Sequence, residues 1–167
     1  MALEIVEADA FVEAQRCGYL AHGCNTMGEM GAGFALHVRL KYPKTFKAYT
    51  KFCNDNDSGL IIGGFFMTEP ENGVQIYNLF TQVYKGKWAR EEYIESSCYT
   101  MLSDAKERKV GEIAVPYLIG CGFGGLKEEK VLPIIEAVSA DFPDTKPTIK
   151  ATAIETAVIS FSVYQIH

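Results

Sequence analysis

The chain has 167 residues, of which 48% are hydrophobic and 22% are charged. These proportions are typical of one globular domain with a substantial core, so we expect a single domain over residues 1–167. The formal net charge is −5, and acidic and basic residues are scattered rather than grouped. No nucleic-acid partner is therefore expected, because binding to many phosphates depends on clustered lysines and arginines.

The cysteines and the N-terminus indicate a reducing, cytoplasmic location. The five cysteines are irregularly spaced and form no Cys-x-x-Cys pair or zinc pattern, so reduced thiols and no metal site are expected. The first seven residues carry acids where a signal peptide needs basic residues. No apolar run approaches the roughly 20 residues of a membrane span, so no membrane contact is expected.

In chain order, short apolar runs alternate with helical patterns. Strands are predicted at residues 3–6, 19–22, 65–68, 74–80, 113–115 and 158–164. Helices are predicted at residues 32–42, 45–53, 90–109 and 127–140. Strands separated by helices predict a layered α/β fold with a mostly parallel central sheet. A turn through Pro70, Glu71, Asn72 and Gly73 predicts one antiparallel hairpin within that sheet.

Two stretches show no regular pattern. Residues 54–59 form a polar run that ends the helix before it. Residues 142–156 contain Pro143 and Pro147, have no clear periodicity and are interpreted as an insertion.

A first glycine-rich loop lies between the predicted strand at 19–22 and the predicted helix at 32–42. Its glycines, Gly28, Gly31 and Gly33, allow tight turns and a close approach of a ligand to the backbone. Free amides at the start of the following helix, with the positive end of the helix dipole behind them, could hold a phosphate without a lysine. The alternative is a tight turn without a ligand, because short glycine motifs have many false positives.

A second glycine-rich loop, at residues 117–126, also follows an apolar strand and precedes a helix. In open α/β sheets ligands bind beyond the carboxyl ends of the strands, so two such loops could hold a diphosphate from both sides. No Gly-Lys-Ser/Thr is present, and the first loop does not have GxGxxG spacing. These absences argue against a kinase-type or a Rossmann-type nucleotide site.

Together these motifs resemble the macro domain family, and most closely its yeast-type ADP-ribose 1''-phosphate phosphatase branch. The matching segments are HGCNTMG at 22–28, GAGFA at 31–35, RLKYP at 39–43, YNLFT at 77–81, PYLIGCGFGGL at 116–126 and SVYQ at 162–165. The resemblance implies a three-layer α/β/α fold with a mixed, mostly parallel sheet. It also implies a pocket for ADP-ribose, which could be free or attached to a protein, or for ADP-ribose 1''-phosphate. No cofactor is implied.

The resemblance assigns roles to individual residues. Asp9 would accept a hydrogen bond from the adenine amino group, and Asn25 would hold the distal ribose. The first loop would contact the diphosphate and the ribose through Gly31, Ala32, Gly33 and Phe34. The opposite wall would be formed by Ile119, Gly120, Cys121, Gly122 and Phe123. Tyr164, near the last predicted strand, would flank the adenine.

Catalytic roles are predicted for His22 and Asn25, which lie on the same loop. A histidine can act as general acid or base because its ordinary pKa is about 6.5. The alternative for His22 is a structural cap at the strand end through a backbone hydrogen bond. His37 is expected on the surface of a helix, and Cys24 is expected to act as a small hydrophobic residue rather than a nucleophile.

One departure from a related branch bears on the chemistry. The branch that removes ADP-ribose from glutamate side chains uses a lysine after the Leu-x-Thr strand and an aspartate in the second loop. Gln82 and Gly124 occupy those positions here, so covalent lysine chemistry is not expected. The segment 82–90 is interpreted as an ordinary loop that buries Trp88 against the next helix, with a mobile rim over the pocket as the alternative.

The leading prediction is an enzyme that removes the terminal phosphate of ADP-ribose 1''-phosphate. Backbone amides of the loops would polarise the phosphoryl group, and His22 would move the proton. Two alternatives share the same pocket: a non-catalytic ADP-ribose-binding module, and a hydrolase of ADP-ribosyl or acetyl-ADP-ribose esters.

Overall fold

The fold is described from a computed structural model that covers residues 3–117, 125–142 and 148–152. Its strands are β1 Leu3–Val6, β2 Tyr19–Asn25, β3 Phe65–Met67, β4 Gln75–Gln82, β5 Glu112–Pro116 and β6 Thr148–Thr152. Its helices are α1 Ala10–Cys17, α2 Gly33–Lys41, α3 Pro43–Asp55, α4 Ser58–Ile61, α5 Glu91–Arg108 and α6 Glu128–Ala140. No helix within these ranges is long and apolar enough to cross a membrane.

Within the described residues the strands form one mixed sheet in the order β1-β6-β5-β2-β4-β3. Every neighbouring pair is parallel except β3 and β4, which form the predicted antiparallel hairpin. Asn72 and Gly73 both have positive φ values, of 51° and 79°, at the turn of this hairpin. A two-residue turn of this kind matches the twist of the strands, and asparagine followed by glycine adopts it readily.

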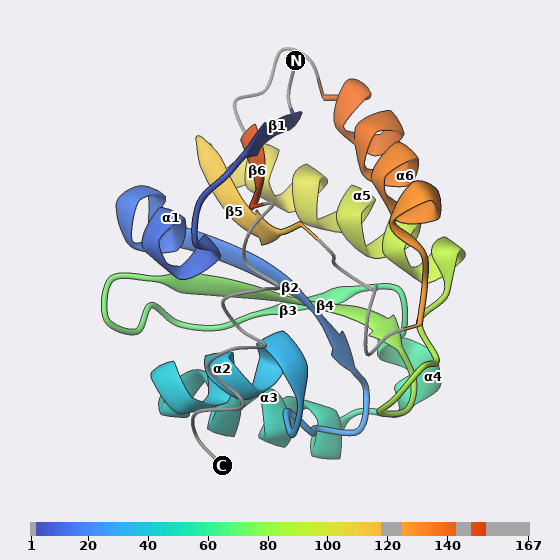
Figure 1. The fold of residues 1–167 in the computed structure, drawn as a ribbon. Helices are drawn as coiled ribbons and strands as arrows, with labels where there is room; N and C mark the ends of the chain where they lie inside the picture. Colours follow the sequence, from blue (N-terminus) through green and yellow to red (C-terminus); the bar gives the residue numbers. More distant parts are fainter. Residues whose placement is uncertain (1–2, 118–124, 143–147, 153–167) are drawn as a thin grey trace.

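Helices cover both faces of the sheet, which confirms the three-layer α/β/α fold (Figure 1). On one face α1, α2 and α3 bury a core that includes Phe11, Val38 and Tyr49. On the other face α5 and α6 bury a second core that includes Met101 and Ile135. The apolar side chains of the central strands β2, β4 and β5 contribute to both cores, because successive residues of a strand point to opposite faces.

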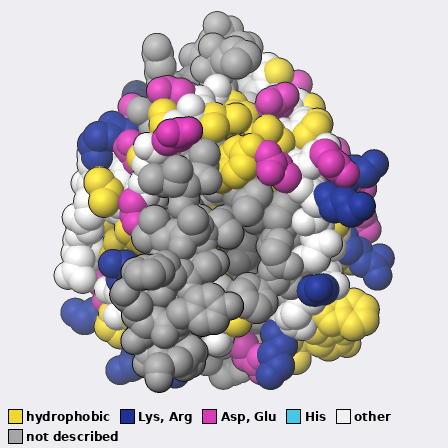
Figure 2. All heavy atoms as spheres, in the orientation of Figure 1, with side chains coloured by type: hydrophobic (Ala, Val, Ile, Leu, Met, Phe, Trp, Pro, Cys, Tyr) yellow, Lys and Arg dark blue, Asp and Glu magenta, His cyan; other side chains and the backbone are white. Residues whose placement is uncertain are grey.

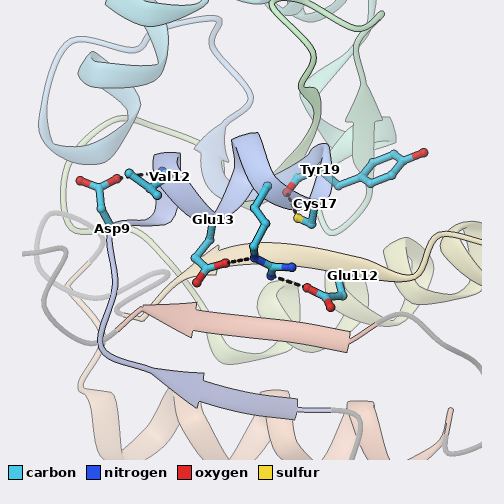
Figure 3. Close-up of polar contacts among 7 residues, drawn as sticks. Asp9, Val12, Glu13, Cys17, Tyr19 and Glu112 are labelled. Carbon is cyan, nitrogen blue, oxygen red and sulfur yellow. Dashed lines mark hydrogen bonds and ion pairs between the residues drawn. The ribbon is translucent and has the colours of Figure 1, made fainter.

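Helix α1 was not among the predicted elements. Its first turn is capped by Asp9, whose carboxylate accepts hydrogen bonds from the amides of Phe11 at 2.7 Å and Val12 at 3.3 Å. Nearer the other end of the helix, the Arg16 guanidinium bridges Glu13 of α1 and Glu112 of β5. Figure 3 shows how these two carboxylates lie toward each other between α1 and the sheet. The cap and the ionic bridge fix this short helix against the sheet.

Three further predictions about elements need correction. β6 lies within the stretch 142–156 and pairs with both β1 and β5, so residues 148–152 belong to the sheet and not to an insertion. α4 begins within the polar run 54–59, because Asp57 caps it by accepting a hydrogen bond from the Gly59 amide. His37 is only 8% exposed, because α2 packs against α3 as well as the sheet. The strand predicted at 158–164 lies outside the described residues.

Candidate functional site

The first glycine loop and the end of β4 meet at one edge of the sheet. β2 and β4 are parallel, so their carboxyl ends lie side by side. Their register shifts between Cys24 and Asn25, where Cys24 pairs with Phe80 but Asn25 pairs with Gln82. β5, which leads into the second loop, is parallel to β2 and ends at the same edge. The structure therefore brings the starting points of both predicted loops together.

Asn25 organises the first loop from inside. Its Oδ1 accepts hydrogen bonds from the amides of Met27 at 3.0 Å and Glu29 at 3.2 Å, and its Nδ2 donates to the Glu29 carbonyl at 2.9 Å. The Tyr49 hydroxyl on α3 donates to the Asn25 carbonyl at 2.5 Å and lies 3.0 Å from Oδ1. Only 7% of Asn25 is exposed, so its amide holds the loop in shape and presents little surface to a ligand.

The three glycines of this loop have different surroundings. Gly28 has a φ of 79° and packs against Thr50 and Cys53 of α3, so it anchors the loop. Gly31 is exposed, and a Cβ placed on it would have no described atom within 4 Å. Gly33 has a φ of 58° and begins α2. The backbone at Gly31 is therefore not covered by any of the described residues, and it lies directly before a helix N-terminus.

The start of α2 offers donors for an anion. Ala32 precedes the helix in an extended conformation, and no side chain caps the first amides of the helix among the described residues. The first amides of a helix have no partner inside it, and they carry the positive end of its dipole. This helix start and the open backbone at Gly31 are the features that a diphosphate requires.

His22 lies beneath the loop and is 1% exposed. Its Nε2 is 2.8 Å from the Asn78 Oδ1 of β4 and 3.3 Å from the Cys24 sulfur. Burial lowers the pKa of His22 to about 4, although the hydrogen bond to Asn78 acts in the opposite direction. The imidazole is therefore neutral at pH 7. Its hydrogen-bond partner Asn78 is a side chain of the neighbouring strand, not the backbone group expected of a strand-end cap.

Cys24 is buried beside His22, and burial raises the pKa of its thiol well above the ordinary value. A thiol in this state is a poor nucleophile, because the thiolate is the reactive form. The geometry agrees with the expectation that Cys24 fills space in a tight loop. Cys121, its counterpart in the second loop, lies outside the described residues.

Asp9 and Phe34 are linked through Phe11. The Phe34 ring stacks on the Phe11 ring, with centroids 4.7 Å apart and planes inclined by 5°. The same Phe34 ring lies 5.8 Å from the His22 ring, so the two side chains are neighbours. Asp9 caps the helix that carries Phe11. The structure thus brings together Asp9, His22, Asn25, Gly31, Ala32, Gly33 and Phe34.

The predicted opposite wall, Ile119 to Phe123, and the predicted adenine neighbour, Tyr164, lie outside the described residues. The described residues nearest to that wall in sequence are Tyr117 and Gly125, and Gly125 has a φ of 86°. A Cβ on Gly125 would lie 2.8 Å from the Lys87 Cβ, so the backbone there packs directly against the segment that follows β4.

That segment, residues 83–90, was interpreted as an ordinary loop, and a rim over the pocket was only the alternative. Its Val83 carbonyl accepts hydrogen bonds from the Thr26 amide and hydroxyl, at 3.1 and 2.9 Å. The side-chain Nε2 of Gln82 donates hydrogen bonds to the carbonyls of Tyr84 and Gly86, at 2.7 and 2.8 Å. These bonds hold the segment in a compact turn. The segment therefore contacts both glycine loops.

The sequence predicted that Trp88 is buried against α5, and this prediction is wrong. It is 58% exposed and lies edge to face with Tyr84, at a centroid distance of 6.3 Å. The turn at Gly86, where φ is 97°, places the glycine backbone beside the indole ring. This backbone turn keeps Trp88 on the surface.

Comparison with known proteins places the chain in a class. The sequence model of the macro domain family matches residues 21–135, which is more than half of the chain. The chain belongs to the macro domain family, and its fold is the one expected of a member.

Two kinds of curated relative are similar to it. The DNA ADP-ribosyl glycohydrolase of Mycobacterium tuberculosis is 29% identical over 133 residues, which cover 78% of this chain and 37% of that protein. The ADP-ribose 1''-phosphate phosphatase of Candida albicans is 34% identical over 82 residues, which cover 47% of this chain and 52% of that protein. The chain thus spans only about a third to a half of the length of these relatives, both of which are named as hydrolases.

Among solved structures, the macrodomain of Thermus aquaticus DarG superposes with a TM-score of 0.76 at 27% identity. The match covers 90% of this chain and 97% of that one. The structure of Thermosipho africanus DarTG in complex with ADP-ribose shares the fold, with a TM-score of 0.75 at 21% identity, covering 95% of this chain and 46% of that one.

Proposed function

We propose that this chain binds ADP-ribose and hydrolyses a bond at the terminal ribose, with ADP-ribose 1''-phosphate as the substrate. The observation that carries the proposal is the start of α2, where uncapped amides follow the open backbone at Gly31. A diphosphate placed there would be held by backbone donors alone. The net charge of −5 is compatible with such a site, because it needs no basic cluster.

The residues gathered at the site have complementary roles in this proposal. Asp9 would accept from the adenine amino group with the carboxylate oxygen that does not cap α1. Gly31, Ala32 and Gly33 would hold the diphosphate, and Phe34 would pack beside it. Asn25 would position the distal ribose chiefly by shaping the loop, because its side-chain atoms already bond the backbone of residues 27 and 29.

The predicted chemical role of His22 stays a prediction, and its surroundings favour an indirect one. A neutral imidazole could accept a proton, but His22 is only 1% exposed and so presents almost no surface to a substrate. Through Asn78 and Cys24 it links the ends of β2 and β4, so it would keep the loop edge in place. Water would then attack the terminal phosphorus while the loop amides polarise the phosphoryl oxygens. The bond between this phosphorus and the 1'' oxygen would break, and a proton of the water would pass to that leaving oxygen.

The proposal is tested by calorimetric titration with ADP-ribose together with phosphate release from ADP-ribose 1''-phosphate. Binding with turnover is the expected result, and binding without turnover would leave a reader module or an ester hydrolase acting on acetyl-ADP-ribose. The variant His22→Gln retains a hydrogen-bond donor toward Asn78. Full turnover in this variant would remove His22 from proton transfer, whereas loss of turnover at unchanged ADP-ribose affinity would assign it a chemical role.

A second function, release of ADP-ribose from DNA, is supported by two observations. The relatives named as DNA ADP-ribosyl glycohydrolases match a larger share of this chain than the phosphatases do. The segment 83–90 adds exposed aromatic and basic side chains beside the loops. The test is incubation with an ADP-ribosylated single-stranded oligonucleotide, followed by chromatography for free ADP-ribose. An unchanged oligonucleotide would exclude this activity.

A further inference from the structure

The segment 83–90 presents two aromatic side chains to solvent at the edge of the site. Tyr84 is 56% exposed and Trp88 is 58% exposed, although both are large enough to be core residues. They lie edge to face and not flat on each other, so a face of each ring stays available. Gln82 fixes the turn between them through its bonds to the carbonyls of Tyr84 and Gly86. The pair is therefore a preformed surface for flat, aromatic groups.

Cations alternate with these rings. Lys85, Lys87 and Arg90 belong to the same short segment and are exposed. The Lys85 ammonium lies 3.7 Å from the Glu29 carboxylate, and the Arg90 guanidinium lies 3.8 Å from the Glu92 carboxylate. All four of these side chains are at least half exposed, so the pairs are weak and a phosphate could displace the carboxylates. Glu91, which begins α5, is the remaining acid within or next to the segment.

We propose that the segment 83–90 binds single-stranded DNA, with bases stacked on Tyr84 and Trp88 and with phosphates beside Lys85, Lys87 and Arg90. Stacking on aromatic rings combined with a few cations is how proteins hold single strands without reading their sequence. The acidic balance of the whole chain argues against a broad basic face, and Figure 2 shows acidic and basic side chains interspersed over one face of the molecule. A stacking surface needs few cations, because the bases contribute much of the affinity.

The position of the segment indicates how single-stranded DNA would lie relative to the candidate site. Residues 83–90 contact the first loop through Thr26 and the second through Gly125. A strand attached to a ribose held between those loops would leave the site across this segment. The inference thus deepens the second proposed function, but binding of unmodified DNA does not require turnover.

Trp88 is the only tryptophan of the chain, so its fluorescence reports directly on this surface. The experiment is a titration of the full chain with an unmodified, mixed-sequence single-stranded DNA of about ten nucleotides, a length within the range of single-strand sites. We expect quenching of the tryptophan emission, weaker binding at higher salt and weaker binding of the same sequence as a duplex, whose bases are already stacked. Absence of quenching, or equal binding of the duplex, would overturn the proposal.

Variants provide a second measurement by fluorescence anisotropy of labelled DNA. Trp88→Ala and Tyr84→Ala should each weaken binding about fivefold or more, and Lys87→Gln should weaken it and reduce its salt dependence. The matched controls are Tyr99→Ala, an exposed aromatic on α5, and Lys47→Gln, an exposed lysine on α3. Equal affinity in Trp88→Ala and Tyr99→Ala would overturn the proposal, because the surface would then be no more important than another exposed ring.

Calorimetry with ADP-ribose on the same variants separates this inference from the proposed function. If ADP-ribose binds and DNA does not, the DNA surface is excluded and the pocket stands. If DNA quenches Trp88 and ADP-ribose does not bind, the DNA surface stands and the pocket is excluded. If the segment instead binds another protein, DNA would not quench Trp88. That result would overturn the proposal.

Discussion

His22 and Asn78 illustrate how burial sets the state of a side chain next to the candidate site. The imidazole is neutral because protonation would place a charge in a region without solvent. Asn78 completes the arrangement, since its Oδ1 lies 2.8 Å from His22 and its Nδ2 donates to the Phe66 carbonyl at 3.0 Å. The pair links β2, β4 and β3 below the loop.

A pH dependence of stability follows from the pKa of His22. The pKa is about 4 in the folded protein and near 6.5 in the unfolded chain, so the unfolded chain takes up the proton first as the pH falls. His22 therefore lowers the free energy of unfolding between about pH 6.5 and pH 4, by up to about 3 kcal/mol in total. Urea unfolding across this range should show a steeper loss in the wild type than in His22→Gln. Parallel curves for the two proteins would contradict the assigned pKa.

Gly31 and Gly33 provide a matched pair of substitutions in the first loop. Gly33→Ala forces a Cβ onto a residue with a φ of 58° and should destabilise the protein by about 1–2 kcal/mol. Gly31→Ala meets no described atom within 4 Å and should leave the stability unchanged. Its methyl group would enter the space proposed for the diphosphate, so its ADP-ribose affinity should fall. Thermal unfolding and calorimetry on both variants check these outcomes, and unchanged affinity in Gly31→Ala would place the diphosphate elsewhere.

The residues of the first loop could be predicted better than their surroundings. Glycine spacing and the following helix indicated the backbone of Gly31 to Gly33, because such loops depend on local conformation. The burial of His37 and the exposure of Trp88 were predicted wrongly, since both depend on tertiary packing. His37 lies in a helix packed on two sides, and Trp88 follows the Gly86 turn outward. The network around Asn25 also depends on a distant residue, Tyr49.

At the scale of the elements, acidic side chains cap the N-termini of helices α1 and α3, but from different places in the sequence. Asp9 caps α1 from the adjacent position, as helix caps usually do. The Glu71 carboxylate caps α3 from the distant hairpin turn, accepting hydrogen bonds from the amides of Lys44 at 3.2 Å and Thr45 at 2.8 Å. Glu71 thus couples the hairpin to the helical layer that carries Tyr49.

Replacing Glu71 should weaken that coupling. Glu71→Ala leaves two amides at the start of α3 without acceptors and should lower the free energy of unfolding by about 1–2 kcal/mol. Glu71→Gln retains one acceptor oxygen and should lose less. Urea unfolding measures both, and Glu69→Ala, an exposed acid on the same turn, is the control. An equal loss in Glu69→Ala would show that the cap contributes nothing.

Element prediction followed the strength of the local patterns. The long helix α5 and the hairpin at Asn72 and Gly73 carry clear signals, and both were predicted. The eight-residue α1 was missed because its stability depends on the Asp9 cap and on packing of Phe11 and Ala14. β6 was missed because Thr148–Thr152 has no apolar run, and its place in the sheet is set by pairing with two distant strands.

At the scale of the whole molecule, β6 lies between β1 and β5 in the sheet and so connects the N-terminal strand to the rest of it. A chain that ends after residue 140 would lose β6 and expose edges of both β1 and β5. It should unfold without a sharp transition and should bind a hydrophobic dye, whereas a chain that ends after residue 152 should keep a cooperative transition. Thermal unfolding with dye binding checks this, and a sharp transition in the shorter chain would show that β6 is dispensable.

The central position of β6 has a consequence for how the protein is made. Leu3 pairs with Ile149, so β1 is synthesised well before its partner strand β6 and cannot join the sheet until β6 has been made. Contacts this far apart in sequence slow folding, and an unpaired strand edge favours association with other chains. During synthesis β1 therefore stays unpaired until β6 is made, and conditions that slow translation of residues 148–152 would prolong this exposure.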